Sequence, residues 1–187
     1  MRRYILRTLG VVAMAASTAA AAYSQGFGFG RWGQFWGTWI WQTQAAPGMT
    51  LTLPALITFH VDGTLSGVDS SPGMPNATIR TSPMYGVWER TGWNSLGGTV
   101  NFLIYDAATG TLKAIGRARS SLLFSDDFDH FQGKMFVESL PCPSGPTSCP
   151  DPLDPAAKWV AQPGMPSDGI SVSGTRLERV AAAPLPQ

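Results

Sequence analysis

The stretch SDDFDHF, residues 125–131, holds the densest group of side chains that could do chemistry. A carboxylate beside an imidazole could act as a general base and acid, or as a pair of metal ligands. The candidates are Asp126, Asp127, Asp129 and His130. On a strand, however, Asp129 and His130 point to opposite faces and cannot easily act together. Acidic residues at a hairpin turn are usually solvated, so we expect a structural turn.

The rest of the chain offers little that indicates catalysis. There is no G-x-S-x-G nucleophile motif, no phosphate-binding glycine loop and no metal-spaced histidine pair. His60 lies opposite the apolar row of its strand, and we expect it at the surface. Charged residues make up 13% of the chain and the formal net charge is +1, without the clustered positive charge that nucleic acid requires. We therefore predict no catalytic residue, metal, cofactor or nucleic-acid partner.

The N-terminus predicts export. Three arginines precede a short apolar run at Leu9–Ala22, and small residues near Ala22 and Ser24 provide a signal-peptidase site. The run is shorter than the roughly 20 residues that span a bilayer. We interpret residues 1–24 as a signal peptide, and the mature protein as periplasmic or secreted, without a membrane span. The RRYILR sequence resembles a twin-arginine signal, but an ordinary secretory signal is the favoured interpretation.

Cys142 and Cys149 lie close together in a proline-rich segment. In an oxidising compartment such a pair is most simply a disulfide, and two cysteines supply only half of a zinc site. Residues 140–169 hold eight of the fifteen prolines, and loops of this length are often lids or binding loops. We expect a semi-rigid flap across one barrel mouth, with Trp159 as its anchor or part of a short strand. A partner-binding surface is the alternative.

Short runs of alternating apolar residues, separated by turn residues, predict an all-β fold without long helices. The expected strands are Trp36–Gln44, Leu51–Val61, Thr64–Asp69, Met84–Thr91, Thr99–Tyr105, Thr111–Phe124, Phe128–Ser139 and Ile170–Val180. About eight sequential strands favour an antiparallel up-and-down barrel, because closure removes the exposed edges; a two-sheet sandwich is the alternative. The barrel domain is predicted to cover residues 36–180, after a flexible lead-in at 25–35 and before a tail at 181–187.

Two short motifs favour closure. Gly37 and Trp39 lie early in the first strand, and Gly174 and Arg176 lie late in the last. In an even-stranded barrel these strands are antiparallel neighbours, so the motifs would meet at one end. Arg176 could then cover the indole of Trp39 and donate to backbone carbonyls, while the glycines allow close approach.

This pairing of an early G-x-W with a late basic residue resembles the lipocalin-like, or calycin, β-barrels. The chain is also similar to small exported bacterial barrels of unassigned role. The likeness rests on Gly37, Trp39 and Arg176. A second lipocalin-type motif and a helix after the last strand are missing from the sequence. The resemblance implies a cup that binds a small apolar molecule, and a barrel filled by its own side chains is the alternative.

The candidate cavity residues are Trp41, Phe59, Trp88, Glu89, Arg90, Phe102, Phe136 and Glu138. Arg117 and Arg119 share one face of their strand, as do Lys134 and Glu138 of the next. We interpret them as an outer-face ladder of cross-strand pairs. Trp36 and Trp32 are the tryptophans that could stack on a surface partner.

Three functions are compatible with this sequence. The leading prediction is an exported barrel that binds a small apolar or amphipathic ligand. The second is a filled structural or interaction barrel that works through residues 140–169. The third is an isomerase- or cyclase-type enzyme, which would require an inward Glu89, Arg90 or Glu138.

Overall fold

The computed structural model describes residues 34–43, 54–70 and 77–177. The chain divides between Gln34 and Phe35 into two units, and the second unit contains every strand that the structure describes. The predicted signal peptide, lead-in residues 25–33, the tail and the ends of three predicted strands (Gln44, 51–53 and 178–180) lie outside the described residues. Among the described residues, no helix is both long enough and apolar enough to cross a membrane.

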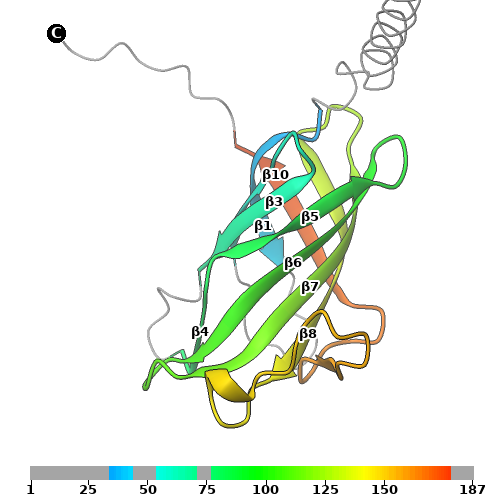
Figure 1. Cartoon of the computed structure of the whole chain (residues 1–187). Helices are drawn as coiled ribbons and strands as arrows, with labels where there is room; N and C mark the ends of the chain where they lie inside the picture. The colour runs from blue at the N-terminus through cyan, green and yellow to red at the C-terminus, as the bar shows by residue number, and fades with distance from the viewer. Residues whose placement is uncertain (1–33, 44–53, 71–76, 178–187) are drawn as a thin grey trace, which may run out of the picture. The chain divides into compact units, whose positions relative to one another are not determined.

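Eight antiparallel strands form a closed barrel (Figure 1). They are β1 (Gly37–Thr43), β2 (Ala55–Phe59), β3 (Thr64–Asp69), β5 (Met84–Arg90), β6 (Ser95–Asp106), β7 (Leu112–Phe124), β8 (His130–Pro141) and β10 (Ile170–Arg176). Each strand pairs with the next along the barrel, and β10 pairs with both β1 and β8. The predicted barrel is therefore confirmed, and the sandwich alternative is wrong.

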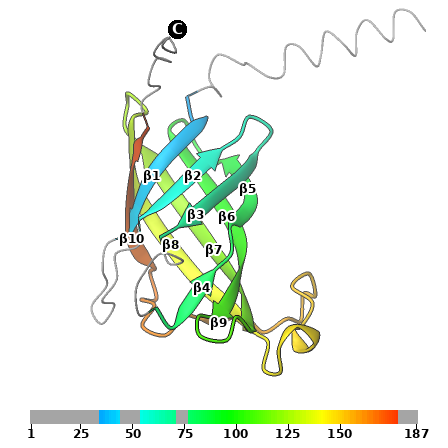
Figure 2. The same cartoon turned by 90° about the vertical axis from the view of Figure 1, so that its left-hand side faces the viewer.

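Among the residues that the structure describes, two short strands and one short helix lie outside this ring. Strand β4 (Ile79–Thr81) pairs with the last residues of β6, and β9 (Val160–Ala161) pairs with β8. Because β6 and β8 run in the same direction, β4 and β9 lie at the same end of the barrel (Figure 2). The 3-10 helix η2 (Pro146–Ser148) follows β8. The sequence did not predict β4.

Tight turns connect most of the strands. Between β2 and β3, Gly63 has a φ of 82°, which favours glycine, and the Asp62 carboxylate accepts a 2.9 Å hydrogen bond from the Thr64 N–H. The turn after β6 ends at Gly110, whose N–H donates to the Asp106 carbonyl at 2.9 Å. Both turns agree with the sequence pattern.

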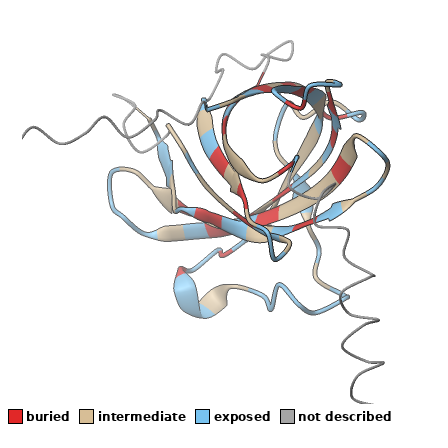
Figure 3. Cartoon of the chain, turned by 90° about the horizontal axis from the view of Figure 1, so that it is seen from above, coloured by how far each residue is buried: buried red, intermediate tan, exposed pale blue. Residues whose placement is uncertain are grey.

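Buried and more exposed residues alternate along the strands, as the view down the barrel shows (Figure 3). Even-numbered residues of β6 and β7 face inward, and odd-numbered residues face outward. At one end the interior is filled by a cluster that we call the aromatic plug: Phe35, Trp39, Phe59, Trp88, Phe124, Phe128 and Phe131.

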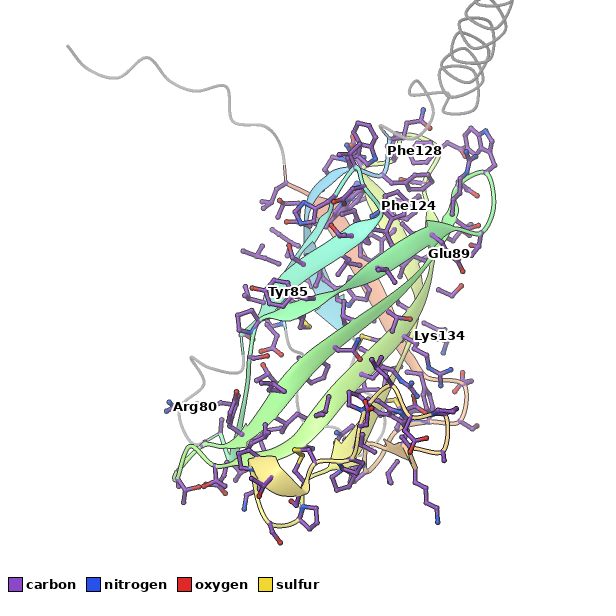
Figure 4. The ribbon with its side chains drawn as sticks, viewed as in Figure 1. Arg80, Tyr85, Glu89, Phe124, Phe128 and Lys134 are labelled. Atoms are coloured by element: carbon purple, nitrogen blue, oxygen red, sulfur yellow. A yellow bond between two sulfur atoms is a disulfide. The ribbon has the colours of Figure 1, made fainter. Side chains whose placement is uncertain are left out.

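The rings of the plug meet mostly edge to face, which is a favourable geometry for aromatic pairs. The Phe124 ring lies 4.9 Å from Phe35 and 5.1 Å from Trp39, measured between centroids. In Figure 4, Phe124 and Phe128 lie together at one end of the barrel, and Arg80 of β4 lies toward the other. Phe35, the last residue of the predicted lead-in, is fully buried in the plug.

Candidate functional site

The half of the barrel away from the plug contains a cavity of about 270 Å³. This volume is close to the lower end of the range for ligand pockets, roughly 300–1,000 Å³. Its wall is mostly apolar and includes Trp41, Ala55, Ile57, Leu65, Ile79, Met84, Val100, Phe102, Ile104, Ala118, Met135, Val137 and Ile170. An eight-stranded barrel is just wide enough to enclose one small ligand, and here one half of it is left hollow.

Small side chains on β7 explain why this half is hollow. Ala118 and Ser120 occupy successive inward positions that line the cavity, whereas Leu122 and Phe124 follow toward the plug; at Gly116, farther from the plug, the ring of Phe102 fills the space that a side chain would take. Gly98 on the neighbouring β6 adds to the space. Ala118 and Ser120 both belong to the stretch of β7 that pairs with β6, which fixes their positions in the barrel wall. Small residues at successive inward positions are visible in the sequence, and they are the signal that could have located the cavity.

Trp41 separates the two halves of the interior. Its side chain lines the cavity, and its ring lies 5.1 Å from the ring of Phe131 in the plug. It is 5% exposed. The indole therefore forms part of the cavity floor.

Five polar residues interrupt the apolar wall: Thr43, Asp69, Thr81, Ser120 and Gln162. The Asp69 and Thr81 side chains form a pair, in which the Thr81 hydroxyl lies 2.9 Å from each carboxylate oxygen. Among the described residues that line the cavity, Asp69 is the only one with an ionisable side chain. An apolar wall with a few placed polar groups is typical of small-molecule sites.

The long segment after β8 reaches the end of the barrel that contains the cavity. Gln162, Pro163 and Met165 line the cavity, and the Gln162 N–H donates to the Val137 carbonyl at 3.0 Å. Trp159 lies against Arg117, with 3.9 Å between the guanidinium carbon and the ring centroid. The predicted Cys142–Cys149 disulfide is present at the start of the segment.

Of the eight predicted cavity residues, Trp41 and Phe102 line the cavity. Phe59 and Trp88 belong to the plug instead. Glu89 is exposed on the outer face (Figure 4). Arg90 is half-buried at the plug end, where its guanidinium lies 6.0 Å from the Phe35 ring centroid and donates to the Gly92 and Trp93 carbonyls. The prediction that these four residues line the cavity is corrected, and β5 contributes Met84 instead.

Phe136 and Glu138 also lie on the outer face, which corrects their assignment to the cavity. Glu138 pairs with Arg117 at 2.8 Å and with Arg119 at 3.2 Å. The Arg119 guanidinium lies 5.7 Å from the centroid of Phe136. These contacts confirm the outer ladder for Arg117, Arg119 and Glu138, whereas Lys134 pairs with Asp168 of the later segment. The inward residues of this strand are Met135 and Val137.

The four predicted closing residues lie together at the plug end. Trp39 pairs with Arg176 in the ladder between β1 and β10, and Trp41 pairs with Gly174. The Arg176 guanidinium lies 4.8 Å from the Trp39 ring centroid and donates to the Phe128 carbonyl at 3.1 Å. Gly37 begins β1 with a φ of 130°.

The acidic turn is held by hydrogen bonds between its own residues. The Asp127 carboxylate accepts hydrogen bonds from the Ser125 hydroxyl and from the Asp129 N–H. Both lower the pKa of the Asp127 carboxyl, and the Ser125 bond has the larger effect. Asp129 lies 3.6 Å from Arg176, and His130 lies 3.3 Å from the Thr175 hydroxyl. No three His, Cys, Asp or Glu side chains among the described residues are placed to hold a metal ion.

His60 and Trp36, which the sequence also indicated as candidates, do not line the cavity. His60 is half-buried, rather than exposed as expected, with its Nε2 atom 2.8 Å from the Ser66 hydroxyl. Trp36 is half-buried, and its indole nitrogen is buried. Trp32 lies outside the described residues.

Comparisons with protein-family models, curated proteins and solved structures found no match for this chain.

Proposed function

We propose that the protein binds one small apolar or amphipathic molecule inside its barrel. The observation that carries the proposal is the 270 Å³ apolar cavity beside a densely packed plug. An interior that needed only to be filled would gain stability from a larger side chain at Ala118, which lines the cavity. Burial of ligand surface against Trp41, Val100 and Ile170 would supply the hydrophobic driving force.

The lipocalin-like resemblance of Gly37, Trp39 and Arg176 supports the same proposal, since cups of that kind carry small ligands. Export to the periplasm or medium is part of the proposal and rests on residues 1–24 alone. The enzyme alternative required an inward Glu89, Arg90 or Glu138, and none of these lines the cavity. The geometry therefore supports binding better than catalysis.

Native mass spectrometry tests the proposal on protein recovered from cells that make it, and on the same protein after denaturation. We expect an additional non-covalent mass of a few hundred daltons that unfolding releases. Protein recovered empty should bind added 1-decanol with 1:1 stoichiometry. An empty protein that neither binds 1-decanol nor gains thermal stability from it would contradict the proposal.

A matched pair of variants locates the binding. Val100 lines the cavity, and its neighbour Asn101 is exposed on the same strand. Val100→Trp should fill the space and weaken 1-decanol binding by at least about tenfold, or 1.4 kcal/mol. Asn101→Trp should leave binding unchanged, and circular dichroism should show both variants folded.

A further inference from the structure

We infer that the ligand of this cavity carries an aromatic ring system rather than a saturated hydrocarbon body. The inference rests on the proposed function, since it names the chemical class of ligand that the same cavity takes. Two features of the cavity wall carry it: aromatic rings on opposite sides, and three methionine side chains.

Two aromatic side chains line the cavity from opposite walls. Trp41 belongs to β1 and Phe102 belongs to β6, and both line the cavity. In the closed ring of strands, β1 and β6 are four strands apart in either direction. A ligand that fills the cavity therefore meets an aromatic ring on each side.

Neighbouring residues position both rings. The centroid of the Trp41 ring lies 5.1 Å from that of Phe131 in the plug. Phe102 pairs with Gly116 of β7, and its ring occupies the space where a Cβ atom of that residue would lie. Because Gly116 has no side chain, the Phe102 ring can lie against the barrel wall and leave the centre of the cavity open. A wall that is already ordered loses little freedom when a ligand binds.

The methionine side chains are concentrated in the hollow half. The three methionines among the described residues, Met84, Met135 and Met165, all line the cavity. They come from β5, from β8 and from the segment after β8, whereas the plug is built from phenylalanine and tryptophan. Methionine is flexible and its sulfur is polarisable, so it adapts to the shape of a ligand and makes favourable contacts with aromatic rings.

The size of the cavity indicates one or two fused rings. An apolar cavity of about 150 Å³ holds one benzene molecule. At the same volume per carbon atom, a cavity of about 270 Å³ holds roughly ten or eleven carbon atoms, which is the size of two fused rings.

Ring–ring and sulfur–ring contacts favour an aromatic ligand over a saturated one with the same skeleton. An aromatic pair contributes up to about tenfold in affinity beyond the burial of apolar area, and a sulfur–aromatic contact contributes a similar factor at most. A saturated ring system has more hydrogen atoms and a larger apolar surface, so the burial of area alone would make it bind more tightly. The two explanations of binding predict opposite orders of affinity.

Two probes with one carbon skeleton and the same hydroxymethyl group separate these cases. They are 2-naphthalenemethanol and decahydro-2-naphthalenemethanol, each titrated calorimetrically into the wild-type protein. We expect the aromatic probe to bind about fivefold or more tightly than the saturated probe.

Phe102→Leu removes one ring from the cavity wall and keeps an apolar side chain there. It should lower the ratio of the two affinities by about threefold. Phe136→Leu is the matched control, because it makes the same substitution on the outer face of the barrel, beside Arg119. It should leave the ratio unchanged, and circular dichroism should show both variants folded.

A triple variant that combines Met84→Leu, Met135→Leu and Met165→Leu tests the sulfur atoms. Leucine and methionine have similar volumes, so the cavity keeps its size. The ratio of the two affinities should fall by about threefold or more. Ile170→Leu changes the cavity wall without removing a sulfur atom, and it should leave the ratio unchanged.

The outcomes distinguish the two proposals. If both probes bind and Val100→Trp prevents it, but the saturated probe binds at least as tightly as the aromatic one, the inference about the aromatic ligand is overturned and the binding function stands. A preference that Phe102→Leu and the methionine variant both leave unchanged would overturn the inference in the same way. If neither probe nor 1-decanol binds the wild-type protein, the binding function itself is contradicted.

Discussion

Arg176 lies over the indole of Trp39, with 4.8 Å between the guanidinium carbon and the ring centroid. The two residues pair directly across the seam between the first and last barrel strands. The same guanidinium donates to the Phe128 carbonyl at 3.1 Å and to the Trp36 carbonyl at 3.4 Å. One side chain therefore ties the barrel seam, the aromatic plug and the turn before β8 together.

Replacing Arg176 should weaken the whole barrel. Arg176→Met removes the contact with Trp39 and leaves two backbone carbonyls without their donor. The free energy of unfolding should therefore decrease by about 2–4 kcal/mol. Urea denaturation measures the change. Arg119→Met is the matched control, because this half-exposed arginine lies at the outer ladder, and it should cost less than about 1 kcal/mol. Equal losses in the two variants would show that Arg176 is an ordinary surface arginine.

Gly174 should not tolerate a methyl group. A Cβ atom at this position would overlap the ring of Phe131, which is held by Trp39, Trp41 and Phe124. Gly174→Ala should therefore destabilise the protein by about 1–3 kcal/mol. Gly97→Ala places the same group 3.4 Å from its nearest neighbour and should change stability by less than about 0.5 kcal/mol. Thermal unfolding that ranks the two variants equally would argue against the tight plug.

Trp159 should hold the segment after β8 against the barrel. Trp159→Ala removes the contact with Arg117, so trypsin should cut after the exposed Lys158 about fivefold faster, equivalent to about 1 kcal/mol of docking free energy. Global unfolding should change little. Val160→Ala, at a neighbouring exposed position, should leave the cleavage rate unchanged. An unchanged rate in Trp159→Ala would mean that this ring does not anchor the segment.

Several turn carboxylates should make the protein sensitive to acid. The pKa of Asp127 lies below its ordinary value of 3.8, chiefly because Ser125 donates a hydrogen bond to the carboxylate. A lowered folded-state pKa contributes stability that is present above 3.8 and is lost as the pH falls through the folded value. Hydrogen bonds from Thr64 and Thr109 lower the pKa of Asp62 and Asp106 in the same way.

These carboxyl groups should therefore change the melting temperature little between about pH 5 and 7. At pH values below about 4, the melting temperature should decrease. Asp127→Asn should make that fall shallower. Asp126→Asn removes a charge from the same turn but keeps the Ser125 bond, so it serves as the control. A melting temperature of Asp127→Asn that falls as steeply as the wild type would contradict this account.

The sequence predicted the barrel because its strands alternate cleanly and its turns carry the residues that tight hairpins need. Asp62-Gly63 marked the tight hairpin between β2 and β3, and the spacing of Trp39 and Arg176 indicated which strands close the barrel. These features depend on local geometry and on strand parity, and both can be counted along the chain.

Which residues line the cavity was harder to predict, because two strands carry apolar residues on both faces. In β8, Phe136 and Val137 are adjacent; Val137 lines the cavity, and Phe136 faces outward beside Arg119 and Glu138. In β5, Val87 and Trp88 pose the same problem. The contact between Asp69 and Thr81 also depends on β4, whose three residues are too few for an alternation signal.

Xenon provides the most direct test of the central claim, that one half of the barrel is packed and the other is hollow. Xenon enters dry apolar cavities and is visible in a crystal structure. A crystal of the ligand-free protein under xenon pressure should show xenon beside Trp41, Val100 and Ile170, and none among Phe35, Trp39 and Phe124. Side chains filling the space beside Val100, with xenon excluded from it, would contradict the account and favour a filled barrel.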